Sequence, residues 1–329
     1  MALKGLLIAS AAVGIGAFLT GCSANARADR AEAAFPPLGE FVEVTGGRVH
    51  YVQEGTGRDI VLLHVAGGNL RDFTFSLVGQ LSDRYRVTAF DRPGQGYTDR
   101  VPGVETGAFA TEGDSPVAQA EMLREASAAL GIQDPIVVGH SFGGIVAMAW
   151  ALGGLDDTRP TDAAAVVSFA GVLMPWPGDL GRYYTVNGSA LGGAITVPLL
   201  TALVPQSRVD EAVINTFAPQ DPVPGYMEYI GGELALRPDA FRANVRQVNT
   251  LRPYVVEMSG RYPELTLPIE ILHGTADDTV PIAVHPQELI KIVPSANLTA
   301  LEGIGHQPHQ VDEPAAIAAI ERAAARSAP

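Results

Sequence analysis

The spacing of apolar and polar residues predicts alternating strands and helices along most of the chain. Residues 40–44 and 48–52 alternate polar and apolar side chains and are joined by Thr45-Gly46-Gly47, which is typical of an antiparallel hairpin. Short runs of apolar and β-branched residues further along are typical of buried parallel strands. These runs lie at residues 60–64, 85–90, 135–138, 165–170 and 268–273, with a last strand near residues 298–301.

Helical segments separate these strands. Ser115 and Pro116 form an N-cap followed by a first-turn proline, and Gly131 ends the helix that they begin. Other helices are expected up to Leu81, after residue 144, and from Pro314 to about Ala325. Strands that alternate with helices at this spacing predict a mostly parallel, doubly wound sheet with helices on both faces, which is an α/β fold.

The alternation stops between about Met174 and Leu265. This stretch is rich in proline and contains scattered helical segments, for example from Pro238 to Val248. It is too long for a loop and lies between two predicted sheet strands, so we expect an inserted helical lid. The α/β domain would then cover residues 38–329, with the lid at about 174–265.

The N-terminal segment has the features of a targeting sequence. Lys4 precedes an uncharged apolar run from Gly5 to Leu19, which is short and glycine-rich for a membrane span. The following Leu-Thr-Gly-Cys at residues 19–22 resembles a bacterial lipobox, and this resemblance implies that residues 1–21 are removed and Cys22 is lipidated. An ordinary secretory signal or an uncleaved anchor is the alternative.

A lipidated Cys22 would hold the protein on a membrane of the bacterial cell envelope, facing the periplasm or the exterior. Residues 22–37 are rich in alanine, charged residues and proline without periodicity. We expect them to form a flexible tether.

Composition excludes several classes of function. The net charge is −14, and no cluster of Lys or Arg is present that would neutralise phosphates, so nucleic acid is not an expected partner. Cys22 is the only cysteine, which rules out an intramolecular disulfide. No Cys/His group has zinc-ligand spacing and no Gly-x-Gly-x-x-Gly follows the first buried strand, so neither a metal nor a cofactor is expected.

The strongest chemical signal is Gly-His-Ser-Phe-Gly at residues 139–143. A buried strand precedes it and an apolar helix follows it, which is the context that a nucleophile elbow requires. The small residues at 139 and 143 let the backbone turn tightly and expose the Ser141 hydroxyl. The Phe142 N–H at the start of the helix would face a developing oxyanion.

A serine nucleophile needs a histidine base, and the histidine needs a carboxylate that fixes its tautomer. His306 is the candidate base because it comes last in the Ser–Asp–His chain order, with His309 as the alternative. Asp277 follows the strand at 268–273 and is the candidate acid, with Asp278 as the alternative.

Taken together, these motifs resemble the α/β-hydrolase superfamily, in its esterase-like and perhydrolase-like branch. The elbow, Asp-Arg-Pro-Gly-Gln-Gly at 91–96, Gly-Thr-Ala-Asp-Asp-Thr-Val-Pro at 274–281 and Gly-Ile-Gly-His at 303–306 occur in the order typical of this superfamily. The resemblance implies Ser141 as nucleophile, His306 as general base and Asp277 as its orienting acid. It also implies an oxyanion hole made by the Phe142 and Ala66 N–H groups.

One position departs from the family pattern. His64 is followed by Val65, where family members usually have glycine. A valine would be strained if the position needed a positive φ, and would narrow the acyl side of the site if the position needed only close packing. Met174, Trp176 and Phe217 are candidate substrate-binding residues for an apolar acyl group, with packing inside the lid as the alternative.

The expected function is cofactor-free hydrolysis of a carboxylic ester, or less readily of an amide or thioester, through an acyl-enzyme. The partner would be a small-molecule acyl substrate. Two alternatives remain: a perhydrolase that transfers the acyl group to peroxide, and a catalytically silent binding lipoprotein. A silent site would place His306 beyond roughly 3.2 Å of the Ser141 hydroxyl.

Overall fold

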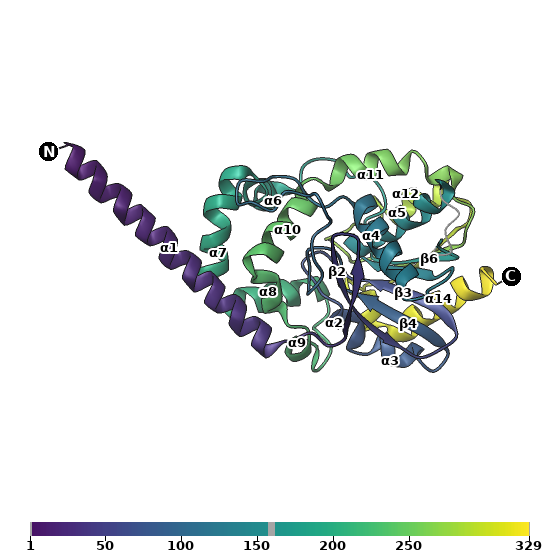
Figure 1. Ribbon diagram of the computed structural model, residues 1–329. Coiled ribbons are helices and arrows are strands. Elements are labelled where there is room, and N and C mark those ends of the chain that lie inside the picture. Colours follow the sequence, from purple (N-terminus) through teal and green to yellow (C-terminus); the bar gives the residue numbers. More distant parts are fainter. Residues whose placement is uncertain (1, 157–161, 329) are drawn as a thin grey trace.

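The computed structural model describes residues 2–156 and 162–328 and contains one eight-stranded sheet (Figure 1). Its strand order is β1-β2-β4-β3-β5-β6-β7-β8, with β1–β2 and β2–β4 antiparallel and every other pair parallel. The strands are β1 (Glu40–Val44), β2 (Gly47–Glu54), β3 (Arg58–Leu63), β4 (Tyr85–Phe90), β5 (Ile136–His140), β6 (Ala165–Phe169), β7 (Ile269–Gly274) and β8 (Ala296–Leu301). The predicted mostly parallel sheet and its N-terminal hairpin are confirmed.

Helices cover both faces of the sheet because successive strand residues point to opposite sides. In β3, Val61 and Leu63 pack toward one face while Ile60 and Leu62 pack toward the other, and all four are fully buried. The first face is covered by α4 (Pro116–Ala129), α5 (Phe142–Asp156) and α12 (Pro286–Ile292). The second is covered by α2 (Arg71–Thr74), α3 (Leu77–Leu81) and α14 (Glu313–Arg326).

The start of α4 shows how local sequence sets an element boundary. The Ser115 hydroxyl accepts a hydrogen bond from the Ala118 N–H at 3.1 Å, and Pro116 occupies the first turn. Gly131, just beyond the helix, has a φ of +67°, a conformation that glycine adopts without strain. The predicted cap and stop are both present.

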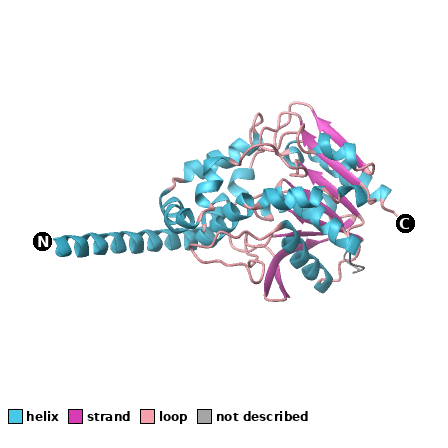
Figure 2. Ribbon diagram, turned by 90° about the horizontal axis from the view of Figure 1, so that it is seen from above, coloured by secondary structure: helices cyan, strands magenta, loops and turns pink. Residues whose placement is uncertain are grey.

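Between β6 and β7 the chain forms the helical lid. Its helices are α6 (Gly181–Asn187), α7 (Val197–Leu203), α8 (Gln206–Phe217), α9 (Tyr226–Tyr229), α10 (Pro238–Asn249) and α11 (Leu251–Ser259). A π-helical turn, Gly192–Thr196, runs directly into α7. Most of these helices lie beside the sheet on the side from which the N-terminal helix emerges (Figures 1 and 2).

The N-terminal segment differs from the expected flexible tether. Helix α1 runs without a break from Ala2 to Ala34 and extends away from the body of the molecule (Figure 2). Its C-terminal part packs on the lid: Ala24 and Ala31 are buried, and Arg27 donates to the Val204 carbonyl. The physical reason is composition, since residues 22–34 contain many alanines and no glycine or proline, which favours helix.

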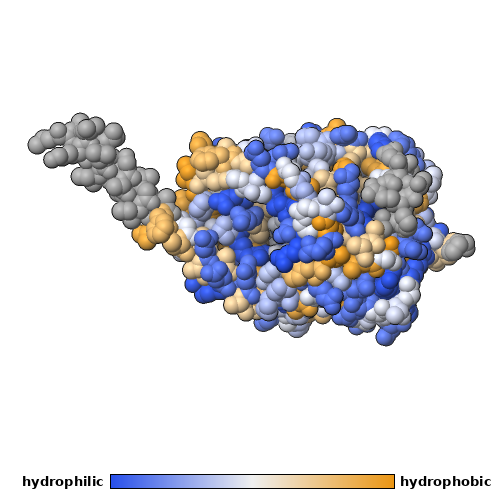
Figure 3. Space-filling view, in the orientation of Figure 1, coloured by the Kyte–Doolittle hydropathy of each residue, from blue (hydrophilic) through white to orange (hydrophobic). Residues whose placement is uncertain are grey.

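The hydropathy of the helices shows which of them could cross a membrane. Among the described residues, no single helix combines the length and apolar character needed to cross a bilayer. The pair formed by Gly181–Asn187 and Gly192–Leu203 meets both requirements together, but it is bent by 86°. Apolar side chains gather on the surface of the lid next to α1 (Figure 3).

Candidate active site

The turn between β5 and α5 holds Ser141 in a strained conformation. Its φ is +54°, a left-handed value that costs energy for any residue with a Cβ atom. The turn is possible because a Cβ at Gly139 would lie 2.2 Å from the Gly143 carbonyl oxygen, and one at Gly143 would lie 2.0 Å from that of Leu63. The two glycines therefore allow the close backbone approach that the sequence motif predicts.

The structure brings the three predicted residues into one hydrogen-bonded chain. His306 Nε2 lies 2.9 Å from the Ser141 hydroxyl oxygen, and His306 Nδ1 lies 2.7 Å from Asp277 Oδ2. They come from the β5–α5 turn, the segment after β8 and the loop after β7. In this arrangement Nδ1–H donates to the carboxylate and Nε2 is free to accept the serine proton.

Asp277 is held as a carboxylate by its surroundings. Its Oδ1 accepts the backbone N–H groups of Thr279 at 3.0 Å and Val280 at 2.9 Å. Burial alone would raise the pKa of the Asp277 carboxyl, but hydrogen bonds from His273 and His306 outweigh it and lower this pKa. The neighbouring Asp278 is exposed, so of the two candidate acids only Asp277 reaches His306.

His306 is kept in its neutral form at neutral pH. Burial lowers the pKa of the His306 imidazole, and the hydrogen bond and negative charge of Asp277 offset part of that effect. Nearby His140 and His273 lower it further. A neutral imidazole is the form that can remove a proton from serine.

Two backbone N–H groups are available as oxyanion donors. Phe142 is the first residue of α5, so its N–H has no partner within the helix. Ala66 lies in the loop after β3. Across the described segments, neither N–H donates to another protein group.

The departure at Val65 is accommodated without backbone strain. Among described non-glycine residues, positive φ occurs at Asp134, Ser141 and Ala170, and Val65 is not one of them. The left-handed residue of this loop is Gly67, with φ +65°. Of the two interpretations of this position, the structure therefore favours close packing, and Val65 lines the cavity described below.

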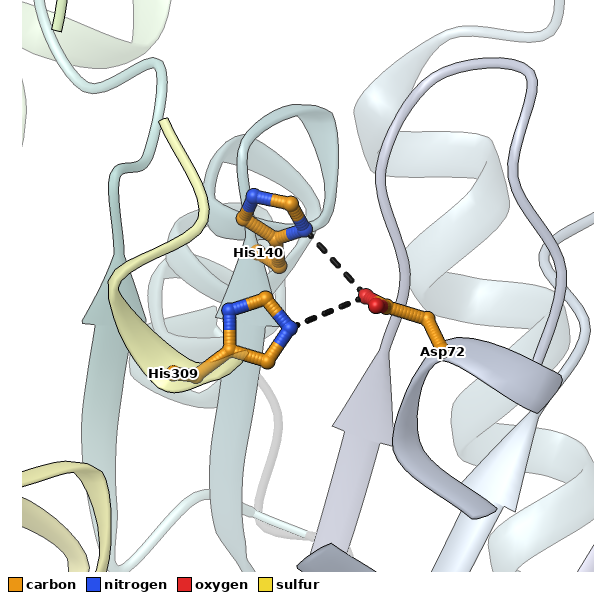
Figure 4. A group of neighbouring side chains, drawn as sticks. All are labelled: Asp72, His140 and His309. Atoms are coloured by element: carbon orange, nitrogen blue, oxygen red, sulfur yellow. Dashed lines mark hydrogen bonds and ion pairs between the residues drawn. The ribbon is translucent and has the colours of Figure 1, made fainter. Parts of the chain in front are cut away.

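A second polar cluster, not anticipated from the sequence, is formed by Asp72, His140 and His309 (Figure 4). Asp72 on α2 accepts His309 Nε2 at 3.1 Å and His140 Nδ1 at 3.3 Å through the same oxygen. Its other oxygen accepts the Tyr226 hydroxyl at 2.8 Å and the Gln310 amide at 3.0 Å. His309, the alternative base, therefore contacts Asp72 rather than Ser141.

The same cluster is the place to consider a metal. Within the described residues, the ligand atoms of Asp72, His140 and His309 lie within 4.8 Å of one another. The Asp72 carboxylate already accepts four hydrogen bonds, which is its full capacity, so hydrogen bonding alone accounts for the arrangement. Burial opposes the charged carboxylate, but His309 and His140 keep the pKa of Asp72 well below its ordinary value.

A largely apolar cavity of about 480 Å³ lies between the loop after β3 and the lid. Ala66, the proposed oxyanion donor, and Gln307, next to His306, line it on the side of the α/β domain. The lid contributes most of the remaining wall. These lid residues include Tyr183, Tyr184, Leu200, Val204, Arg208, Val213, Tyr226 and Phe241.

The three residues predicted to bind the substrate do not line this cavity. Phe217 is fully buried in a lid cluster, with its ring edge-on to Tyr226 at 5.0 Å. Met174 and Trp176 are half-buried against the domain core, and the Met174 N–H donates to His285. For Phe217 the alternative prediction, packing inside the lid, is the one that fits. The sequence pattern does not reveal which side of a lid helix faces the site.

With the fold and site described, the comparisons with known proteins define the class. The family model described as the alpha/beta hydrolase family matches residues 60–320, and the chain belongs to this family. An uncharacterised protein of Mycobacterium tuberculosis (strain ATCC 25618 / H37Rv) is 27% identical over 294 residues, covering 87% of this chain and 81% of that protein.

Solved structures show the same fold at low sequence identity. The structure described as a membrane phospholipase A, a bacterial virulence factor, has a TM-score of 0.65 at 19% identity, covering 98% of this chain and 97% of that one. The esterase RhEst1 from Rhodococcus sp. ECU1013 has a TM-score of 0.65 at 20% identity, covering 87% and 98%.

Proposed function

We propose that this alpha/beta hydrolase is a serine hydrolase that cleaves carboxylic esters through an acyl-enzyme. The observation that carries the proposal is the unbroken chain from the Ser141 hydroxyl through His306 to Asp277, with contacts of 2.9 and 2.7 Å. A catalytically silent protein would have no need for this geometry, since a contact beyond roughly 3.2 Å would serve packing equally well.

Each residue has a defined part in the proposed reaction. His306 Nε2 takes the proton of Ser141 as its oxygen attacks the ester carbonyl carbon, and Asp277 stabilises the imidazolium that forms. The Phe142 and Ala66 N–H groups stabilise the negative oxygen of the tetrahedral intermediate. The intermediate collapses when the carbonyl re-forms and the alkoxide leaves, taking the proton from His306.

The second half of the reaction repeats these roles with water. His306 removes a proton from water, the hydroxide attacks the acyl carbon, and a second tetrahedral intermediate collapses to release the carboxylic acid. The proton returns to the Ser141 oxygen. Water is the only co-reactant that this sequence of steps needs.

The size and lining of the cavity support the proposal that the lid binds the acyl group of the substrate. A volume of about 480 Å³ falls within the range of sites for small molecules, and its lining is mainly apolar. The esterase and membrane phospholipase among the structural relatives are consistent with an ester substrate that has an apolar acyl chain.

The lipobox-like Cys22 motif supports a further part of the proposal, that the protein is attached to a membrane of the cell envelope. Cys22 is exposed on α1, where an acyl chain could be added. Because α1 continues as a helix to Ala34 and packs on the lid, the attachment would be through a rigid arm rather than a tether.

The first test is hydrolysis of p-nitrophenyl acetate, butyrate and octanoate by the full chain in detergent, beside Ser141→Ala. The native protein is expected to hydrolyse these esters, and Ser141→Ala to be inactive with an unchanged circular dichroism spectrum. The dependence of the rate on acyl length would then measure the size of the acyl pocket. Absence of turnover together with absence of labelling by a fluorophosphonate would overturn the proposal.

A further inference from the structure

The outer side of the lid carries an ordered apolar surface that the proposed reaction does not use. Leu191, Ile195, Leu199 and Leu203 follow one another at intervals of four residues and are 69%, 57%, 43% and 69% exposed. A four-residue interval places them on one side of the helical run that continues from Leu191 through the π-helical turn and α7. We call this row the lid stripe.

Neighbouring elements extend the apolar surface. Tyr183 and Val186 on α6 are about half exposed. The space-filling view shows apolar side chains both at the top of the lid and on α1 (Figure 3). A contiguous apolar surface on a monomer is typical of an interaction site.

The charge distribution indicates what kind of partner fits. The chain carries a net charge of −14, yet no Asp or Glu occurs from Gly181 to Val209. The charged residues of that stretch are Arg182 and Arg208, and Arg208 pairs with Glu211 just beyond it. An apolar segment that contains no acids and has an arginine near each end suits the interface of a bilayer that contains anionic lipids.

The position of α1 points to the same partner. Cys22, the proposed site of lipidation, is exposed on α1, and Arg27 on the same helix donates to the Val204 carbonyl directly after α7, beside which α1 lies (Figure 1). A lipid attached at Cys22 would therefore bring the bilayer next to the lid stripe. A second copy of the chain would cover the stripe without using the lipid.

We infer that the lid stripe docks on the surface of a lipid bilayer and places the opening of the cavity at that surface. Leu200 on α7 and Val204 directly after it line the cavity wall, while Leu199 and Leu203 on α7 are exposed and do not line it. An apolar acyl chain can then pass from the bilayer to the site along one helix. This inference rests on the proposed ester hydrolysis for its substrate, but not for the docking itself.

Docking is tested directly by fluorescence. Tryptophan is introduced as Leu199→Trp, or as Ile290→Trp on α12, which is exposed and far from the stripe (Figure 1). The full chains are bound to vesicles of phosphatidylcholine and phosphatidylglycerol that contain brominated acyl chains. Quenching of the residue 199 variant above the native background, without extra quenching at 290, is expected. Equal quenching in both variants while the protein is vesicle-bound would overturn the inference.

The consequence for substrate delivery is tested by a double variant. Ile195→Glu with Leu199→Glu is expected to lower hydrolysis of a long-chain ester embedded in the vesicles by about tenfold, because the docking surface is lost. Hydrolysis of soluble p-nitrophenyl acetate should be unchanged, since neither residue lines the cavity. The matched control is Val256→Glu with Ile290→Glu, two exposed apolar positions on other helices, which should retain both activities.

The outcomes separate the two proposals. Loss of both activities in the stripe variant would contradict a docking role, and so would retention of both. If the native protein is inactive on every ester while Leu199→Trp is quenched by the vesicles, the proposed function is contradicted and docking is supported. If the native chain is a dimer in detergent, the stripe variant is a monomer, and Leu199→Trp is not quenched, the stripe would be assigned to contact with a second copy instead.

Discussion

The Nε2 atom of His140 lies 2.9 Å from the backbone carbonyl oxygen of His306. The other ring nitrogen, Nδ1, faces the Asp72 carboxylate at 3.3 Å. Through these two contacts the His140 ring joins the backbone of His306 to the Asp72 carboxylate. The rings of His140 and His306 lie close together, with their centroids 5.1 Å apart.

This contact has a consequence for the acid limb of the pH–activity profile. His140 lowers the pKa of the His306 imidazole, and so keeps this base neutral to lower pH. His140→Gln keeps a side chain that can donate but removes the imidazole. The pKa of His306 should then rise, and the acid limb of kcat/KM should move upward by about one pH unit.

His309→Gln is the matched control for that variant. His309 also bonds to Asp72, but it contacts neither Ser141 nor the His306 carbonyl. Asp277 and His273, which also shift the pKa of His306, remain in both variants. An acid limb at the native position in His140→Gln, or an equal shift in His309→Gln, would contradict a specific effect of His140 on His306.

The left-handed conformation of Ser141 predicts a gain in stability when the residue is replaced by glycine. Its φ of +54° costs a residue with a Cβ atom roughly 1–2 kcal/mol, and glycine avoids this cost while losing more chain entropy on folding. Ser141→Gly should therefore exceed Ser141→Ala in its free energy of unfolding by on the order of 1 kcal/mol. Urea denaturation measures this difference. Equal stability of the two variants would show that the turn stores no strain.

Asp277 and Asp278 offer a paired test of the orienting acid. Asp277→Asn removes the charge that holds the His306 tautomer, and kcat should fall by about 10³-fold or more. Asp278→Asn changes an exposed side chain and should leave kcat within a factor of about two. Rates with p-nitrophenyl acetate, measured beside circular dichroism spectra, separate the two. Similar losses in both variants would indicate a general disturbance of the loop.

Residues 139–143, Asp277 and His306 could be placed from sequence because local chemistry determines them. A left-handed serine between a strand and a helix needs small neighbours, and parallel strands bring their carboxyl ends to one edge of the sheet. The cap at Ser115 was predictable for the same reason, since one hydroxyl bonds an N–H three residues ahead.

Other features depend on contacts between distant segments. The cluster at Asp72 joins α2, β5, α9 and the segment after His306, and no short spacing in the sequence links these residues. Phe217 points into the lid rather than the cavity because of how α8 and α9 pack. The tether prediction for residues 22–37 failed because it relied on the lack of an apolar period, whereas alanine content and docking on the lid stabilise the helix.

His64 provides a prediction for the pH dependence of stability. Its Nε2 accepts the Arg92 N–H at 2.9 Å and its Nδ1–H donates to the Val65 carbonyl at 2.8 Å, so the ring is held neutral. Burial, with the nearby charge of Arg92, lowers the pKa of His64 to about 4. Between about pH 6.5 and 4 the unfolded chain binds a proton at this residue that the folded chain does not.

Stability should therefore fall as the pH drops through that window, with no contribution from His64 above it. The shift corresponds to about 3 kcal/mol over the full window, and His285, with a pKa also lowered to about 4 by burial, adds to it. His64→Gln removes the titrating group and retains an oxygen that can accept the Arg92 N–H. The free energy of unfolding in urea, measured at intervals from pH 7 to 4, should decline less steeply in this variant than in the native chain. Parallel declines would mean that His64 takes up a proton equally well in the folded and unfolded states.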